Sequence, residues 1–200
     1  MIRNIIFDFG GVLVDWNPHY LFDPYFGDSD KTSWFLENIC TMEWNTKVDC
    51  GWPMAEATEA LVAQHPEWEK EIRMYFGQWR KMMGKAIPGM TEYVAELKRR
   101  SYPVYGLTNW SAETLYTIFD NYEVLGMLDG KIVSGEERLV KPDPRIFRVL
   151  LERFGIKAQE SVFIDDNPAN VEGARSVGLH GIRFTGVDNL RKELEALLSF

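Results

Sequence analysis

Four short segments of the sequence carry side chains that could do chemistry. They are Asp8 with Gly10 and Gly11, Thr108 with Asn109, Lys141, and Asp165 with Asp166. Asp8 interrupts an apolar run, "IIFDFGGV", and the two adjacent acids directly follow the apolar run "SVFI". A lone carboxylate at the end of a buried strand either pays a desolvation cost or takes up a proton. These acids therefore need partners.

The spacing of these segments predicts that they meet in the folded chain. In an open parallel sheet, ligands bind at the carboxyl ends of the strands. Asp8, Asp165 and Asp166 would repel one another there unless a cation lay among them, and hard oxygen ligands suit Mg²⁺. Lys141 and a hydroxyl beside that metal would receive an anionic group. We therefore expect a Mg²⁺ site that binds an anion.

The two glycines after Asp8 fit the same chemistry. Gly10 and Gly11 let the backbone N–H groups of the turn approach a phosphate closely, although a Gly-Gly pair alone more often marks a tight turn. The predicted reaction is attack by the Asp8 carboxylate on a phosphoryl group, which forms an aspartyl-phosphate that water then hydrolyses. Positioning and neutralisation of charge would supply most of the rate.

The elements that must position these side chains follow from the apolar pattern. Strands are expected at Ile2–Asp8, 104–108, 130–135, 161–165 and 181–184, and helices at 90–100, 111–122, 143–154, 170–178 and 189–200. Gly155 would end the helix at 143–154. Strand and helix alternate from residue 88 onward, which predicts an α/β protein with a doubly wound parallel sheet.

Residues 16–87 break this alternation. They show helical spacing in 31–45, 54–65 and 67–83, and they hold six of the seven tryptophans. This block is interpreted as a helical insertion, with Pro88 and Gly89 marking the return to the sheet. Most of its tryptophans should be core, but Trp16 and Trp44 are expected to line a cleft where a substrate binds.

Composition excludes several classes of partner. Two hundred residues at 46% hydrophobic content suffice for one sizeable core, and the formal charge is −8. No basic block exceeds Arg99-Arg100, which argues against nucleic acid or an anionic membrane as the main partner. Two cysteines without metal-ligand spacing, no leader-like segment and no run long enough to span a bilayer predict a cytoplasmic protein.

The motifs resemble those of a known superfamily. The order of "FDFGGVLVD", "LTNWS", "VKPDPRIF" and "FIDDNPANVEGA" is similar to the four motifs of the haloacid dehalogenase superfamily, from the first strand to about Leu179. The insertion resembles that superfamily's helical cap. The resemblance implies a Rossmann-like catalytic core of residues 1–15 and 88–200, with a cap at 16–87.

The resemblance also implies roles for the metal-binding residues. Asp8 would be the nucleophile and a metal ligand, and the carbonyl of Gly10 would be a further ligand. Asp166, helped by Asp165, would hold Mg²⁺, and Asn170 would orient the acidic loop. The remaining residues would handle the anion: Thr108 and Asn109 would bind the transferring group, and Lys141 would neutralise it.

One departure from the superfamily pattern concerns the acid that gives a proton to the leaving oxygen. Phosphatases of this superfamily usually carry a second Asp two residues after the nucleophile, and here that position is Gly10. General acid catalysis is worth about 10²- to 10⁴-fold. Another group or water must supply the proton, or the substrate has a good leaving group, such as an anomeric sugar hydroxyl. Asp15 is interpreted as a hinge residue rather than as a replacement acid.

The favoured function is a Mg²⁺-dependent phosphatase acting on a small phosphorylated metabolite, with a sugar phosphate as the suggested substrate class. Dehalogenases of the superfamily also lack the second Asp, but their acidic motif loses a carboxylate and their first motif typically contains tyrosine. This chain keeps Asp165 and Asp166 and has no such tyrosine. A third reading is a non-catalytic protein that binds a phosphorylated ligand.

Overall fold

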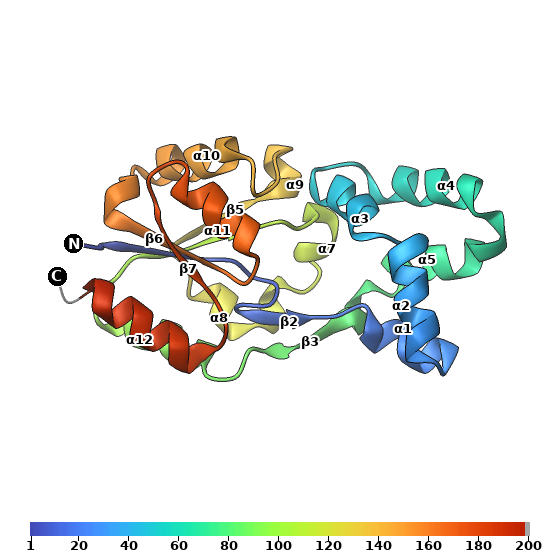
Figure 1. Ribbon diagram of the computed structural model, residues 1–200, viewed down its shortest axis with the longest axis horizontal. Coiled ribbons are helices and arrows are strands. Elements are labelled where there is room, and N and C mark those ends of the chain that lie inside the picture. Colours follow the sequence, from blue (N-terminus) through green and yellow to red (C-terminus); the bar gives the residue numbers. More distant parts are fainter. Residues whose placement is uncertain (199–200) are drawn as a thin grey trace.

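A five-stranded parallel sheet forms the centre of the molecule, whose computed structural model describes residues 1–198 (Figure 1). The strands are β1 (Asn4–Phe7), β4 (Val104–Thr108), β5 (Gly130–Val133), β6 (Ser161–Asp165) and β7 (His180–Arg183), in the order β5-β4-β1-β6-β7. The first strand lies in the middle, because Ile5 pairs with Val104 on one side and Val162 on the other. The predicted doubly wound α/β fold is confirmed.

Both faces of the sheet are covered by helices. Ile6 and Phe163 face a core built with α10 (Pro144–Phe154) and α11 (Pro168–Arg175). Their neighbours in sequence point the other way, since side chains alternate along a strand, and pack with α6 (Met90–Arg99) and α12 (Val187–Leu198). Figure 1 shows α10 and α12 on opposite sides of the sheet. The continuous apolar runs of the strands follow from this two-sided burial.

The segment between β4 and β5 differs from its prediction. In place of one helix over 111–122 the chain forms α7 (Ala112–Leu115), a 3-10 turn at Phe119–Asn121 and then α8 (Glu123–Gly126). The hydroxyls of Thr114 and Thr117 donate to carbonyls three residues earlier, at 3.3 and 2.7 Å. Such bonds compete with regular helix geometry, and the β-branched and aromatic residues that follow are weak helix formers. A further short helix, α9 (Ser134–Glu137), follows β5.

The insertion forms five helices that lie beyond one end of the sheet, far from the N-terminus and from α12 in Figure 1. They are α1 (His19–Phe26), α2 (Ser29–Asn38), α3 (Met42–Asp49), α4 (Met54–Gln64) and α5 (Glu69–Gly77). The pattern at 31–45 gives two helices instead of one, because the Thr41 hydroxyl caps α3 by accepting from the N–H of Trp44 at 3.2 Å. None of the helices within residues 1–198 has the length and apolarity needed to cross a bilayer.

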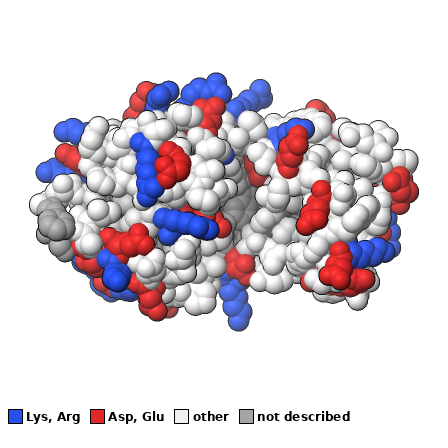
Figure 2. All heavy atoms as spheres, viewed as in Figure 1, with Lys and Arg blue, Asp and Glu red and all other residues white. Residues whose placement is uncertain are grey.

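A two-stranded antiparallel sheet joins the insertion to the rest of the chain. Its strands are β2 (Val14–Trp16) and β3 (Met83–Ala86), and the sequence pattern did not predict it. Acidic and basic side chains are interspersed over the face seen in Figure 2, without a continuous patch of one sign.

Candidate active site

Three carboxylates meet at the carboxyl ends of the two central strands. Asp8 directly follows β1, Asp165 ends β6, and Asp166 comes next. One oxygen of each lies within 4.8 Å of the others. Asp8 and Asp165 are buried, whereas Asp166 is exposed. The fold therefore brings together the acids that the sequence singled out.

Lys141 lies between two of these acids. Its ammonium group is 2.7 Å from Oδ1 of Asp8 and 2.7 Å from Oδ2 of Asp165, and it donates to the carbonyl of Leu107 at 3.0 Å. The three N–H donors of an ammonium are thus all used. Burial by itself would lower the pKa of Lys141, but the two carboxylates outweigh it and raise that pKa above its usual value. Lys141 is a fixed positive charge beneath the site.

Two asparagines position these groups. Asn170 donates to both oxygens of Asp165, at 3.2 and 3.0 Å, and the backbone N–H of Asn167 donates to Oδ1 at 2.8 Å. Asn109 holds the backbone of Lys141, accepting from its N–H at 2.8 Å and donating to its carbonyl at 3.0 Å. Asp165 therefore has its oxygens occupied by protein donors, while Asp166 faces the open space.

The electrostatics of the cluster favour a cation. Burial raises the pKa of Asp8 to about 7, with Lys141 opposing the rise and Asp165 adding to it. Burial and the neighbouring Asp165 also raise the pKa of Asp166. A bound cation would stabilise these carboxylates in their charged form. Because the donors are all carboxylate oxygens, the set fits a hard divalent ion such as Mg²⁺.

The turn after Asp8 approaches the acidic loop closely. Gly11 has φ +76°, and a Cβ at this position would lie 2.7 Å from Oδ2 of Asp166. Glycine is therefore required there by both conformation and space. A Cβ at Gly10, in contrast, would have no neighbour within 4 Å. The space beside Gly10 is open.

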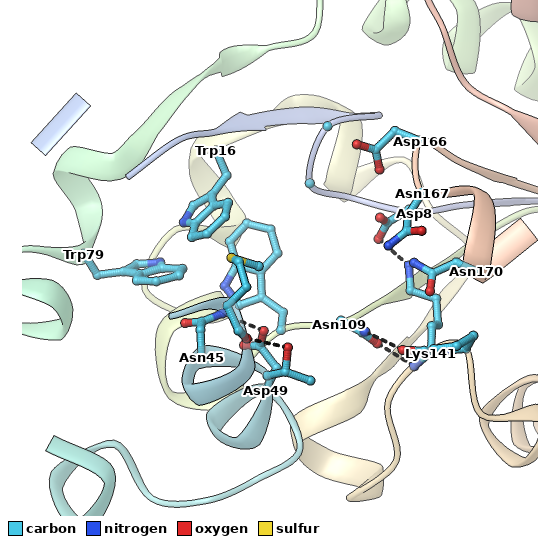
Figure 3. A pocket seen from close by; sticks show the side chains of 16 residues that line it. Asp8, Trp16, Asn45, Asp49, Trp79, Asn109, Lys141, Asp166, Asn167 and Asn170 are labelled. Atoms are coloured by element: carbon cyan, nitrogen blue, oxygen red, sulfur yellow. Dashed lines mark hydrogen bonds and ion pairs between the residues drawn. The ribbon is translucent and has the colours of Figure 1, made fainter. Parts of the chain in front are cut away.

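A cavity of about 590 Å³ lies between these groups and the helical insertion (Figure 3). Core residues in its wall include Asp8, Gly10, Gly11, Asn109, Lys141, Asp166, Asn167 and Asn170. The opposite wall comes from the insertion: Trp16, Met42, Asn45, Thr46, Asp49 and Trp79. A ligand bound to the acidic cluster would therefore contact both parts of the chain.

Three predicted residues lie outside this wall: Asp165, whose partners are given above, Trp44 and Thr108. Trp44 is buried within the insertion, where its indole N–H donates to the carbonyl of Ala57 at 3.1 Å and its ring packs against Tyr75 and Phe76. The expectation that Trp44 lines the cleft is thus not met, because the indole N–H and the ring of Trp44 both bind partners in the core of the insertion. Thr108 is buried at the end of β4, with no hydrogen-bond partner for its hydroxyl within residues 1–198.

Five wall residues from the insertion were missed by the sequence reasoning: Met42, Asn45, Thr46, Asp49 and Trp79. One signal was present for Asp49. It is the last residue of α3, and a carboxylate at a helix C-terminus opposes the helix dipole, so a local role in the helix does not explain it. Asn45 and Trp79 carry no comparable signal, because their positions depend on how the insertion packs.

Comparison with known proteins agrees with the fold and identifies the family of the chain. The family model of haloacid dehalogenase-like hydrolases matches residues 2–178. The chain therefore belongs to the haloacid dehalogenase-like hydrolase family. The resemblance of the four motifs is confirmed.

Relatives within the family differ in their reactions. A sesquiterpene phosphatase from Aspergillus oryzae is 30% identical over 183 residues, which cover 90% of this chain and 88% of the relative. An (S)-2-haloacid dehalogenase from Burkholderia cepacia is 28% identical over 132 residues, covering 66% of this chain and 57% of the relative. Several other curated relatives are matched over less than two thirds of their length.

A solved structure shows the same fold. It is a family enzyme from Bacteroides thetaiotaomicron, determined in complex with magnesium and inorganic phosphate. The TM-score is 0.69 at 21% identity, with 93% of this chain and 96% of that chain covered. The two chains thus share the fold over nearly their whole lengths.

Proposed function

We propose that this protein is a cytoplasmic Mg²⁺-dependent phosphatase that hydrolyses a small phosphorylated metabolite through an aspartyl-phosphate on Asp8. The observation that carries the proposal is the position of Asp8 in the cavity wall, with Asp166 on one side and Lys141 beneath it. Residues 1–15 and 88–200 would act as the catalytic core, and residues 16–87 as the cap over it.

The hydrogen bonds of Asp8 leave one oxygen for attack. Oδ1 accepts from the ammonium of Lys141 and from the N–H of Phe9, each at 2.7 Å. Oδ2 has no hydrogen bond from residues 1–198 and would attack the phosphorus, displacing the oxygen of the leaving group. Lys141 would offset charge on the transferring group, and Asn109 would keep Lys141 in place. Water would then release phosphate and regenerate the Asp8 carboxylate.

Asp8 and Asp166 would be the side-chain ligands of Mg²⁺, with Asp165 supporting them and the Gly10 carbonyl as a backbone ligand. When bound, the metal would draw negative charge from the phosphoryl oxygens and reduce their repulsion of the nucleophile. Two observations support this part of the proposal. The donor set is made of oxygens, and a structure of the same fold contains magnesium with phosphate.

The wall contributed by the insertion suits a sugar or polyol phosphate. The rings of Trp16 and Trp79 lie 5.5 Å apart and border the cavity, and Asn45 in the same wall carries an amide group. Aromatic faces pack well against C–H groups, and amides bind hydroxyls in either direction. A phosphorylated compound with several hydroxyls would use both features.

The test is phosphate release from a panel of sugar phosphates and one aryl phosphate, with Mg²⁺ and with EDTA. We expect metal-dependent release that disappears in Asp8→Asn. Release of chloride from 2-chloropropionate, without any phosphate release and without a metal requirement, would replace the proposal by the dehalogenase alternative. Binding of sugar phosphates without any turnover would favour a non-catalytic protein.

A further inference from the structure

The acid that protonates a leaving group is missing from the turn after the nucleophile, because that position is Gly10. Asp49, from the insertion, offers a carboxyl group in the same cavity. It belongs to the wall that faces Asp166 and Lys141 in Figure 3, and only 8% of its surface is exposed. A group in this place would meet the part of a substrate that points away from the metal.

Asp49 is held rigidly by neighbours on both parts of the chain. Its Oδ1 accepts from the backbone N–H of Ser111 at 3.0 Å, and its Oδ2 accepts from the amide of Asn45 at 2.9 Å. Its backbone carbonyl accepts from the hydroxyl of Ser134 at 2.5 Å. A carboxyl group has about four acceptor positions. Two are used here, so there is room for a proton.

The surroundings of Asp49 favour the protonated form. Burial raises the pKa of Asp49 to about 7, the N–H of Ser111 opposes this rise, and the charge of Asp8 adds to it. No Lys, Arg or His within residues 1–198 forms an ion pair with Asp49, in contrast to Asp165, which has Lys141. The buried side chain of Tyr75 also interacts electrostatically with the carboxyl group of Asp49. A carboxylic acid with a pKa near neutrality is suited to donate and then accept a proton.

We propose that Asp49 is the general acid of the reaction and takes the place of the Asp that Gly10 lacks; this inference rests on the proposed phosphatase function. As Asp8 attacks, the bond between phosphorus and the leaving oxygen breaks, and that oxygen takes both electrons of the bond and the proton of Asp49. The alcohol departs, and Asp49 is left as a carboxylate. In the second step this carboxylate takes a proton from the attacking water, while the phosphorus–oxygen bond to Asp8 breaks and phosphate is released.

The contacts of Asp49 also suit a purely structural role, as a tie between the insertion and the core. The two roles differ in their dependence on the leaving group. A general acid matters for an alkyl phosphate, whose alkoxide is a poor leaving group, and much less for p-nitrophenyl phosphate, whose phenolate leaves without a proton. A structural tie would affect both substrates equally.

The experiment compares kcat/KM of Asp49→Asn on an alkyl phosphate and on p-nitrophenyl phosphate. The new amide keeps an acceptor for Ser111, and a turn of the Asn45 amide, whose Oδ1 is unpartnered within residues 1–198, would satisfy its N–H groups. We expect a loss of about 10²- to 10⁴-fold on the alkyl phosphate and a much smaller loss on the aryl phosphate. Ser134→Ala, which removes a tie without removing an acid, should affect both substrates alike.

A rescue experiment tests the same assignment by adding an acid at a second position. A side chain fits at Gly10, so Gly10→Asp in the Asp49→Asn background should restore part of the alkyl phosphate activity. Equal losses on the two substrates, with no rescue, would overturn the role of Asp49 and leave the phosphatase in place. A wild-type protein that hydrolyses neither substrate with Mg²⁺ would overturn the proposed function and this inference with it.

Discussion

The ammonium group of Lys141 lies 2.7 Å from Oδ2 of Asp165, and neither side chain is exposed. The same ammonium also pairs with Asp8. Removing one partner of a buried ion pair leaves an uncompensated charge, which costs far more than the pair itself contributes. The stability of the fold and the proposed chemistry therefore depend on the same three charged groups, those of Asp8, Lys141 and Asp165.

Lys141→Met should abolish phosphate release and lower the free energy of unfolding in EDTA by about 3–5 kcal/mol at pH 8. The loss should be smaller at pH 5, because the pKa of Asp8 is raised to about 7 and its protonation then relieves its repulsion of Asp165. Denaturant unfolding at both pH values measures this. Lys157→Met is the control, since its 3.8 Å pair with Glu160 is exposed and should contribute no more than about 1 kcal/mol. Equal losses in the two variants would contradict the account.

Gly11→Ala should weaken Mg²⁺ binding about 10- to 100-fold, a typical effect of disturbing a group that orients a metal ligand. The added methyl would collide with Asp166, which must move. Isothermal titration with Mg²⁺ measures the effect. Gly155→Ala is the matched control, because Gly155 also has positive φ but no neighbour within 4 Å. It should lose stability through backbone strain and keep its metal affinity; a similar fall in affinity there would show that strain alone is responsible.

Asp49 should make the protein less stable as the pH rises. Its pKa, about 7 in the folded chain, lies above the ordinary value of 3.8. The folded state therefore holds more protons between pH 4 and pH 7, and the free energy of unfolding falls through that window. In Asp49→Asn the fall between pH 5 and pH 8 should be smaller, by on the order of 2 kcal/mol.

Urea unfolding in EDTA at the two pH values measures this difference, and the contribution of Asp8 is common to both proteins. An identical pH dependence in wild type and variant would show that Asp49 is ionised in the folded chain throughout, which would remove one support for its role as an acid.

Trp16→Ala should raise the KM for a sugar phosphate roughly two- to tenfold, as expected for the loss of one aromatic contact. The inhibition constant of inorganic phosphate should stay the same, because phosphate occupies the acidic end of the cavity and does not reach this ring. Steady-state kinetics give both numbers. Trp34→Ala, at an exposed tryptophan outside the cavity wall, is the control. An equal change in both constants would place Trp16 in the anion site instead.

The parallel sheet and the acidic end of the site could be predicted because short stretches of sequence determine them. An acid directly after an apolar strand has few explanations, and the carboxyl ends of parallel strands must meet at one edge. Asp8 and Asp165 follow from these two statements alone. Lys141 was found only through its place between the motifs, since a lysine before a proline is otherwise unremarkable.

The wall formed by the insertion could not be predicted in the same way. Trp44 and Trp79 both occur in helical patterns, and only packing decides that Trp79 borders the cavity while Trp44 is enclosed. Asp49 faces the cavity because its backbone is bound by Ser134, 85 residues away in sequence. The pair β2 and β3 was missed for a related reason, since a strand of three residues is too short to show an alternating pattern.

The proposed role of Asp8 as nucleophile is tested most directly by trapping the aspartyl-phosphate. Wild-type protein is mixed with a sugar phosphate labelled in its phosphoryl group and Mg²⁺, quenched in acid within one turnover, and mapped by peptide mass spectrometry. We expect phosphate on the peptide that contains Asp8, and none in Asp8→Asn or in EDTA. Metal-dependent phosphate release without label on that peptide, or Asp8→Asn turning over at the wild-type rate, would contradict it.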